Sequence, residues 1–150
     1  MRLARERVWR GEMPVKSTLN EEVATAFPVS EAIPRLEPGV YAMVARPATR
    51  SGDDDNGWAT QWFVVSDLGL AALTGDDGIH TFVRSLATAD PVGGANVRLI
   101  ARNNEVLAST RSDASGYVRF DAGLSRGEGG LAPAIIVADS AAGDYAFLDL

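Results

Sequence analysis

Short runs of β-branched, aliphatic and aromatic residues alternate along the chain with clusters of Gly, Asp, Asn and Ser. Such runs, separated by turn signals about every 8–12 residues, are typical of an all-β sandwich or barrel. In the first half the predicted strands are Val8–Val15, Thr25–Val29, Gly39–Arg46 and Ala59–Ser66. In the second half they are Leu70–Leu73, Ile79–Ser85, Asn96–Ala101, Val106–Thr110, Tyr117–Phe120, Ala134–Ala138 and Tyr145–Leu150.

Two of these strands alternate clearly between apolar and polar residues. In the first, Val97, Leu99 and Ala101 share one face, and in the second Val118 and Phe120 point away from Arg119. The stretch Arg102–Glu105 predicts a tight hairpin turn, because Asn tolerates positive φ. The stretch Ser112–Gly116 predicts a second turn, in which the Asp113 side chain caps the backbone and Gly116 supplies positive φ.

Helix is scarce in this pattern. Glu21–Ala26 offers one turn ahead of Pro28. Ser30–Ile33 begins with a good N-cap and then meets Pro34, so at most one turn is expected there.

The two halves differ in how complete they are. Residues 68–150 supply seven predicted strands, enough for a whole two-sheet sandwich, whereas residues 1–67 supply four, too few to cover both faces of one. We therefore predict two consecutive antiparallel β-sandwich domains of immunoglobulin or fibronectin type. Residues 1–67 are interpreted as the C-terminal part of the first domain, Ser66–Gly69 as the hinge, and Ala48–Gly57 as a long polar loop.

The amino-acid composition excludes several kinds of partner and reactive group. The chain has 150 residues, 14 Lys and Arg against 20 Asp and Glu, a net charge of −6, one His and no Cys. This acidic balance argues against a nucleic-acid partner. The lack of Cys excludes disulfides, Cys-ligated metals and thiol nucleophiles within this chain. The basic start Met1–Arg7 lacks a following apolar region, so no signal peptide is predicted, and the run Ala134–Ala138 is too short to span a bilayer.

Five features of the sequence could have a functional interpretation. The acidic cluster Ser51–Gly57 lacks the glutamate that a calcium loop needs six residues after its glycine, so a solvated loop is favoured. Gly75–Gly78 has the composition of a hairpin turn. His80 is predicted to be a partly buried strand residue, because no G-x-S-x-G motif accompanies it. Gly127–Gly130 lacks the parts of a phosphate-binding loop. The tryptophans Trp9, Trp58 and Trp62 fit core or interface packing. We therefore predict no catalytic, cofactor-binding or metal-binding residue and no cofactor.

Several stretches together resemble the bacterial alpha-2-macroglobulin family. Gly39-Val40-Tyr41, within Leu36–Tyr41, matches the entry to a late strand of a macroglobulin-type sandwich, and Ala59–Leu70 resembles the link between two successive domains. The series continues through Phe82–Ala89, Pro91–Leu99, Ala101–Leu107, Asp113-x-x-Gly116 and Gly143–Leu150. The resemblance implies a broad-spectrum protease-trapping inhibitor in which bait cleavage changes the molecule's shape and a Cys–Gln thioester binds the protease.

On this resemblance we expect structural domains without bait region, thioester or enzymatic activity. The expected partners are neighbouring macroglobulin domains of the same chain and, through the full-length protein, target proteases, with no nucleic acid and no direct membrane contact. A periplasmic location with an inner-membrane-anchored parent is also implied. The alternative is an adhesion or ligand-binding sandwich, linked to calcium through Asp53 to Asp55; an enzyme would depend on His80.

Overall fold

A computed structural model describes residues 7–48 and 58–150. The chain divides into two compact units, the first comprising Met1–Glu37 and Ala42–Gln61, the second Pro38–Tyr41 and Trp62–Leu150. The domain boundary that we predict after residue 67 stays a prediction.

The first half forms fewer strands than its sequence pattern predicts. Strands β1 (Gly39–Ala45) and β2 (Ala59–Val65) pair in a two-stranded sheet, and α1 (Val29–Ala32) is a single helical turn, as expected before Pro34. The predictions of strands over Val8–Val15 and Thr25–Val29 and of a helical turn over Glu21–Ala26 are wrong. A run of apolar residues forms a strand only where a second strand hydrogen-bonds to it. A single isolated helical turn is unstable, because its one or two hydrogen bonds do not offset the entropy lost in ordering the backbone.

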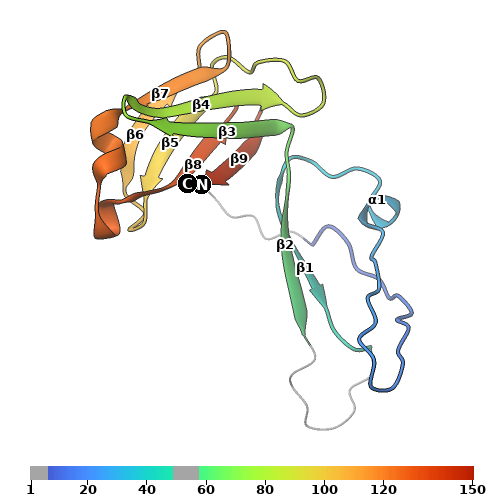
Figure 1. The fold of residues 1–150 in the computed structure, drawn as a ribbon. Helices are drawn as coiled ribbons and strands as arrows, with labels where there is room; N and C mark the ends of the chain where they lie inside the picture. Colours follow the sequence, from blue (N-terminus) through green and yellow to red (C-terminus); the bar gives the residue numbers. More distant parts are fainter. Residues whose placement is uncertain (1–6, 49–57) are drawn as a thin grey trace. The chain divides into compact units, whose positions relative to one another are not determined.

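The second half is a sandwich of two antiparallel sheets (Figure 1). One sheet has the order β3-β4-β7 and the other β6-β5-β8-β9, so the all-β prediction is confirmed. All seven stretches predicted as strands after Leu68 form strands. Their bounds are β3 (Leu68–Gly75), β4 (Gly78–Ser85), β5 (Asn96–Ala101), β6 (Val106–Arg111), β7 (Tyr117–Asp121), β8 (Pro133–Asp139) and β9 (Tyr145–Asp149).

The core lies between these two sheets, and β5 and β7 contribute to it by alternation of buried and more exposed residues. Val97 and Leu99 of β5 are fully buried, and Val118 and Phe120 of β7 face them from the other sheet, as the pattern predicts. The remaining buried apolar residues are Leu68, Ile79, Val83, Ala95, Ala101, Ile136, Val137, Ala138 and Ala146. Among the described residues before Leu68, none is buried.

The predicted turns follow the expected backbone chemistry. In the β5–β6 hairpin Asn104 has a φ of 68°, and the side-chain oxygen of Asn103 accepts a hydrogen bond from the Glu105 N–H at 3.0 Å. In the β6–β7 connection Asp113 Oδ1 accepts hydrogen bonds from the N–H groups of Ser115 and Tyr117, at 2.8 and 3.0 Å. Between β7 and β8 the chain forms two short 3-10 helices, η1 (Ala122–Arg126) and η2 (Gly129–Leu131).

Candidate functional site

The β3–β4 turn brings a carboxylate and the chain's one histidine together. Gly75 and Gly78 pair across the turn, as their composition predicts. Gly78 has a φ of 131°, and a Cβ there would collide with the carbonyl oxygen of Phe120 in the neighbouring strand β7. Glycine is therefore required at this position. The tight turn it permits brings the Asp77 side chain against the ring of His80, three residues later.

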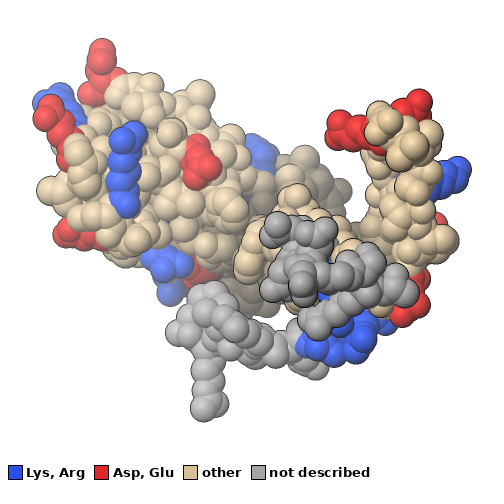
Figure 2. All heavy atoms as spheres, turned by 90° about the horizontal axis from the view of Figure 1, so that it is seen from below, with Lys and Arg blue, Asp and Glu red and all other residues tan. Residues whose placement is uncertain are grey.

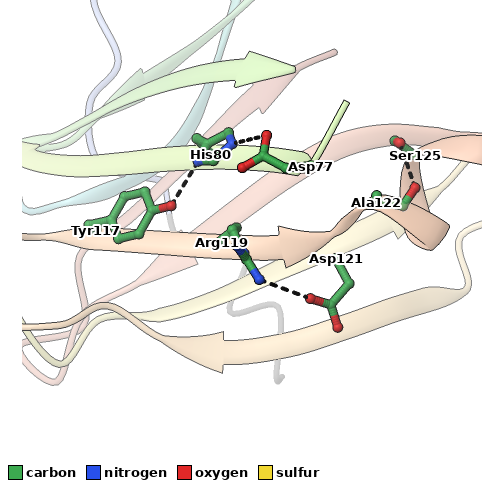
Figure 3. Close-up of polar contacts among 7 residues, drawn as sticks. All are labelled: Asp77, His80, Tyr117, Arg119, Asp121, Ala122 and Ser125. Atoms are coloured by element: carbon green, nitrogen blue, oxygen red, sulfur yellow. Dashed lines mark hydrogen bonds and ion pairs between the residues drawn. The ribbon is translucent and has the colours of Figure 1, made fainter. Parts of the chain in front are cut away.

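His80 lies between two hydrogen-bonding partners (Figure 3). Its Nδ1 is 2.7 Å from the Tyr117 hydroxyl, and its Nε2 is 2.9 Å from Asp77 Oδ1. In a neutral imidazole this geometry assigns the proton to Nε2, which donates to the carboxylate, while the tyrosine hydroxyl donates to Nδ1. The side chain of His80 is 24% exposed, which confirms the prediction of a partly buried strand histidine.

The charged groups of this cluster are engaged in hydrogen bonds and an ion pair that connect parts of the fold. The hydrogen bond from His80 holds the pKa of Asp77 below its usual value, with burial opposing the shift. Beside it on β7, Arg119 and Asp121 form a long ion pair of 3.7 Å. The polar bonds therefore connect the β3–β4 turn, β4 and β7 across one outer sheet face.

The cluster lacks the geometry of a nucleophilic triad. The Ser125 hydroxyl donates to the carbonyl oxygen of Ala122 at 2.8 Å, as Figure 3 shows, and not to His80. Both imidazole nitrogens already have partners, so neither is placed to take a proton from a serine. Within residues 7–48 and 58–150, no group of three or more His, Asp or Glu side chains could hold a metal ion.

A second group of polar bonds surrounds Asp67, between β2 and β3. The Asp67 N–H donates to Asp144 Oδ2 at 2.8 Å, and Asp67 Oδ1 accepts from the Ala87 N–H at 2.8 Å. A hydrogen bond from Ser85, with those from the backbone, lowers the pKa of Asp67, against the effect of burial. These roles are not predictable from the sequence pattern, because the contacts join residues up to 77 positions apart.

The other features singled out in the sequence form no further candidate site in the described residues. The acidic cluster Ser51–Gly57 lies outside the described residues. Gly127–Gly130 contributes to η2, whose residue Gly130 has its carbonyl bonded to the Asn103 N–H at 2.9 Å. Trp58 and Trp62 are more than half exposed, and Arg46 lies over the Trp58 ring at 5.5 Å. On the face shown in Figure 2, acidic and basic side chains of the sandwich are interspersed.

An open surface pocket lies at the start of β3. Its volume is about 270 Å³. It is lined by Val64, Ser66, Leu68, Leu86, Ala146 and Phe147. This lining offers hydrophobic contact and no ionisable side chain.

The chain is similar in sequence and in structure to alpha-2-macroglobulins of bacteria. The family model of the bacterial alpha-2-macroglobulin MG3 domain matches residues 65–150. Over 58 residues, 38% of the chain, the sequence is 40% identical to the alpha-2-macroglobulin of Pasteurella multocida. This chain spans 3% of the length of that relative.

Two solved structures of native Escherichia coli alpha-2-macroglobulin are also similar. One spans domains NIE-MG1, with a TM-score of 0.74, 24% identity, and coverage of 95% of this chain and 64% of the other. The second spans MG0-NIE-MG1, with a TM-score of 0.64, 27% identity, and coverage of 83% and 37%. Both fragments span more than one domain of a single polypeptide, and this chain covers part of each.

Proposed function

Because the chain belongs to the bacterial alpha-2-macroglobulin family, we propose that it is a structural part of a broad-spectrum protease-trapping inhibitor. Its role there is to hold neighbouring macroglobulin domains of the same polypeptide in place and to withstand or relay the change of shape that follows bait cleavage. The observation that carries this proposal is the extent of the family match, which runs through all of the sandwich from residue 65 to residue 150.

The reactive parts of such an inhibitor would lie elsewhere in the polypeptide. A Cys–Gln thioester needs a cysteine, and this sequence has none. The proposal therefore assigns neither bait region nor thioester to these 150 residues, and reaches target proteases only through the full-length protein.

The proposal also excludes enzymatic activity and a membrane role for this piece. The polar groups most like a catalytic arrangement belong to Asp77, His80 and Tyr117. They bond to each other and are not among the residues that line the pocket at the start of β3. None of the helices in the described residues has the length and apolarity to cross a membrane. We place the parent protein in the periplasm, anchored to the inner membrane, on the strength of the family alone.

The adhesion alternative rests on residues that the structure does not describe. Its calcium link would use Asp53 to Asp55, and these residues belong to the undescribed range 49–57. A calcium-bound module thus stays a prediction, which a calcium titration of the thermal midpoint would test.

The proposed scaffold role is tested with the full-length polypeptide that contains this chain. We expect that polypeptide to inhibit an endoprotease acting on a protein substrate, and the 150-residue chain alone to leave the protease fully active. In the full-length protein, Leu99→Ala removes a fully buried side chain and should cost about 2–5 kcal/mol of domain stability and reduce inhibition. Leu73→Ala, at a 65% exposed position, is the matched control and should inhibit normally.

Two results would contradict the proposal. One is inhibition by the 150-residue chain alone, which would place an inhibitory site within it. The other is a full-length protein that leaves proteases of several specificities uninhibited while its Leu73→Ala and unmodified forms are folded by circular dichroism.

A further inference from the structure

The connector Ser66–Asp67, between β2 and β3, is bonded on one side to the β8–β9 turn. The Asp67 N–H donates to Asp144 Oδ2 at 2.8 Å, and the other oxygen of that carboxylate, Oδ1, accepts from the Tyr145 N–H at 2.7 Å. Asp144 is only 7% exposed, so its carboxylate is shielded from water on most sides. Its charge is compensated by these N–H donors, which makes the bond to Asp67 costly to break.

The same connector is bonded on its other side to the loop after β4. The carbonyl oxygen of Asp67 accepts from the Leu86 N–H at 2.7 Å, and its Oδ1 accepts from the Ala87 N–H at 2.8 Å. The hydroxyl of Ser85 also hydrogen-bonds to the Asp67 carboxylate. The N–H, the carbonyl and the carboxylate of Asp67 are thus all engaged, with two segments of the sandwich.

The residues on either side of Asp67 add to this restraint. The Ser66 hydroxyl oxygen accepts from the Leu68 N–H at 2.9 Å, and Leu68 itself is buried in the core. The Leu86 side chain lies against Gly69, where a Cβ would come within 2.7 Å of its Cδ2. The segment Ser66–Gly69, which the sequence analysis interprets as a hinge, is therefore attached to the sandwich through hydrogen bonds and packing.

We propose that Asp67 and Asp144 anchor the connector to this domain. Movement between this domain and the preceding one then occurs on the N-terminal side of Ser66, and it does not enter β3. The inference rests on the proposed function only in taking two successive domains to meet here, and its test involves no protease. Failure of the scaffold role and failure of the anchor are therefore separate outcomes.

Carboxylates suit this role because each offers two acceptor oxygens and no donor. At Asp144 both oxygens face N–H groups, so an asparagine would direct an NH₂ group at one of them. The Asp67 carboxylate bonds chiefly to the Ser85 hydroxyl and the Ala87 N–H, with the Leu86 N–H contributing least, and a hydroxyl can accept from an amide. The anchor therefore predicts that Asp67→Asn retains much of the restraint and that Asp144→Asn does not.

The first test uses the unmodified 150-residue chain. Backbone ¹⁵N relaxation should give Ser66 and Asp67 order parameters typical of rigid backbone, about 0.85, equal to those of β4. Order parameters below about 0.6 at these two residues, typical of a flexible linker, would overturn the proposal.

The second test compares amide hydrogen exchange in variants. In Asp67→Ala and Asp144→Ala, the amides of Leu68, Gly69 and Leu70 should exchange at least ten-fold faster, while Ile79 in β4 changes no more than in the control. The matched control is Asp113→Ala, which removes a carboxylate with equivalent backbone bonds from the β6–β7 turn. If the alanine variants do not fold, the asparagine variants replace them: Asp144→Asn should speed exchange at these three amides, and Asp67→Asn should change it little. Equal exchange at Leu68–Leu70 in the Asp144 and Asp113 variants would overturn the anchor.

Discussion

At the scale of single residues, several aspartates fix turns and connections of the sandwich through hydrogen bonds. Asp67, Asp77 and Asp113 each accept hydrogen bonds from a nearby side chain, namely Ser85, His80 and Ser115, and these bonds lower all three pKa values. The role of Asp113 is predictable from its turn, in which its partners lie within four residues. The partner of Asp77 is also close in sequence, three residues away, but no turn pattern indicates that bond. The partners of Asp67 and the tyrosine beside His80 come from distant strands, and a single sequence does not reveal such pairs.

These shifts predict how stability depends on pH. A carboxyl whose pKa is lower in the folded than in the unfolded chain adds stability that is fully present above the unfolded value, about 3.9, and is lost as pH falls through the folded value. We expect the denaturant midpoint to fall steeply below that pH. His80→Ala removes the main cause of the Asp77 shift and should make this fall shallower. Denaturant titrations from pH 7 to pH 2 measure both effects.

The control for the pH experiment is Asp76→Asn, at a neighbouring carboxyl for which the structure shows no bond to His80. Its acid profile should match that of the unmodified chain. A His80→Ala profile identical to both would show that the hydrogen bond to Asp77 contributes nothing to acid stability.

Thr81 gives a second prediction at this scale. It is fully buried in β4, and its hydroxyl has no hydrogen-bond partner in the described structure. Thr81→Val replaces the hydroxyl with a methyl of nearly the same shape and should stabilise the chain by about 1 kcal/mol. Thr110→Val, at an exposed position of β6, should change stability far less. Thermal or urea unfolding of both variants provides the measurement, and a destabilised Thr81→Val would show that the hydroxyl does have a partner.

At the scale of elements, the sequence pattern predicts strands well only where the chain contains their partners. Every predicted strand after Leu68 forms, because β4 pairs with β7 in one sheet, β5 pairs with β8 in the other, and the apolar faces of the two sheets are buried against each other. Val8–Val15 and Thr25–Val29 have similar composition, but no described strand pairs with them. Strand pairing depends on two segments, so the hydrophobic pattern of one segment does not reveal whether a partner strand is present.

The β3–β4 hairpin supplies the prediction for an element. Gly78→Ala introduces a Cβ at a φ of 131° and against the Phe120 carbonyl, so we expect a loss of about 2 kcal/mol or more. Gly123→Ala in η1 meets nothing within 4 Å and should be close to neutral. Urea unfolding compares the two variants. Similar stabilities would show that the turn relaxes without cost.

At the scale of the whole molecule, the hydrophobic core belongs to the second half of the chain. In residues 7–48 and 58–150, the 13 buried apolar residues all lie between Leu68 and Ala146, and the residues before them are partly or fully exposed. The stability of the 150-residue chain should therefore reside in the sandwich, with the earlier residues contributing little of their own.

A shortened chain tests this distribution. Removing residues 1–57 should leave the thermal midpoint within about 3 °C of that of the whole chain, since a change of 1 kcal/mol shifts the midpoint of such a domain by about 4–8 °C. Differential scanning calorimetry would show a single transition in both. A fall of more than about 8 °C would mean that the first half stabilises the sandwich directly.

The bond between Asp67 and Asp144 also shows that β3 and β9 begin close together. Because these residues immediately precede β3 and β9, the first and last strands of the sandwich start from the same end and run the same way. The backbone thus enters at one pole and finishes toward the opposite pole, advancing roughly 20 Å over β9 and its flanks. A module with this polarity can be added to a tandem array without a return segment, so successive copies extend the array in one direction.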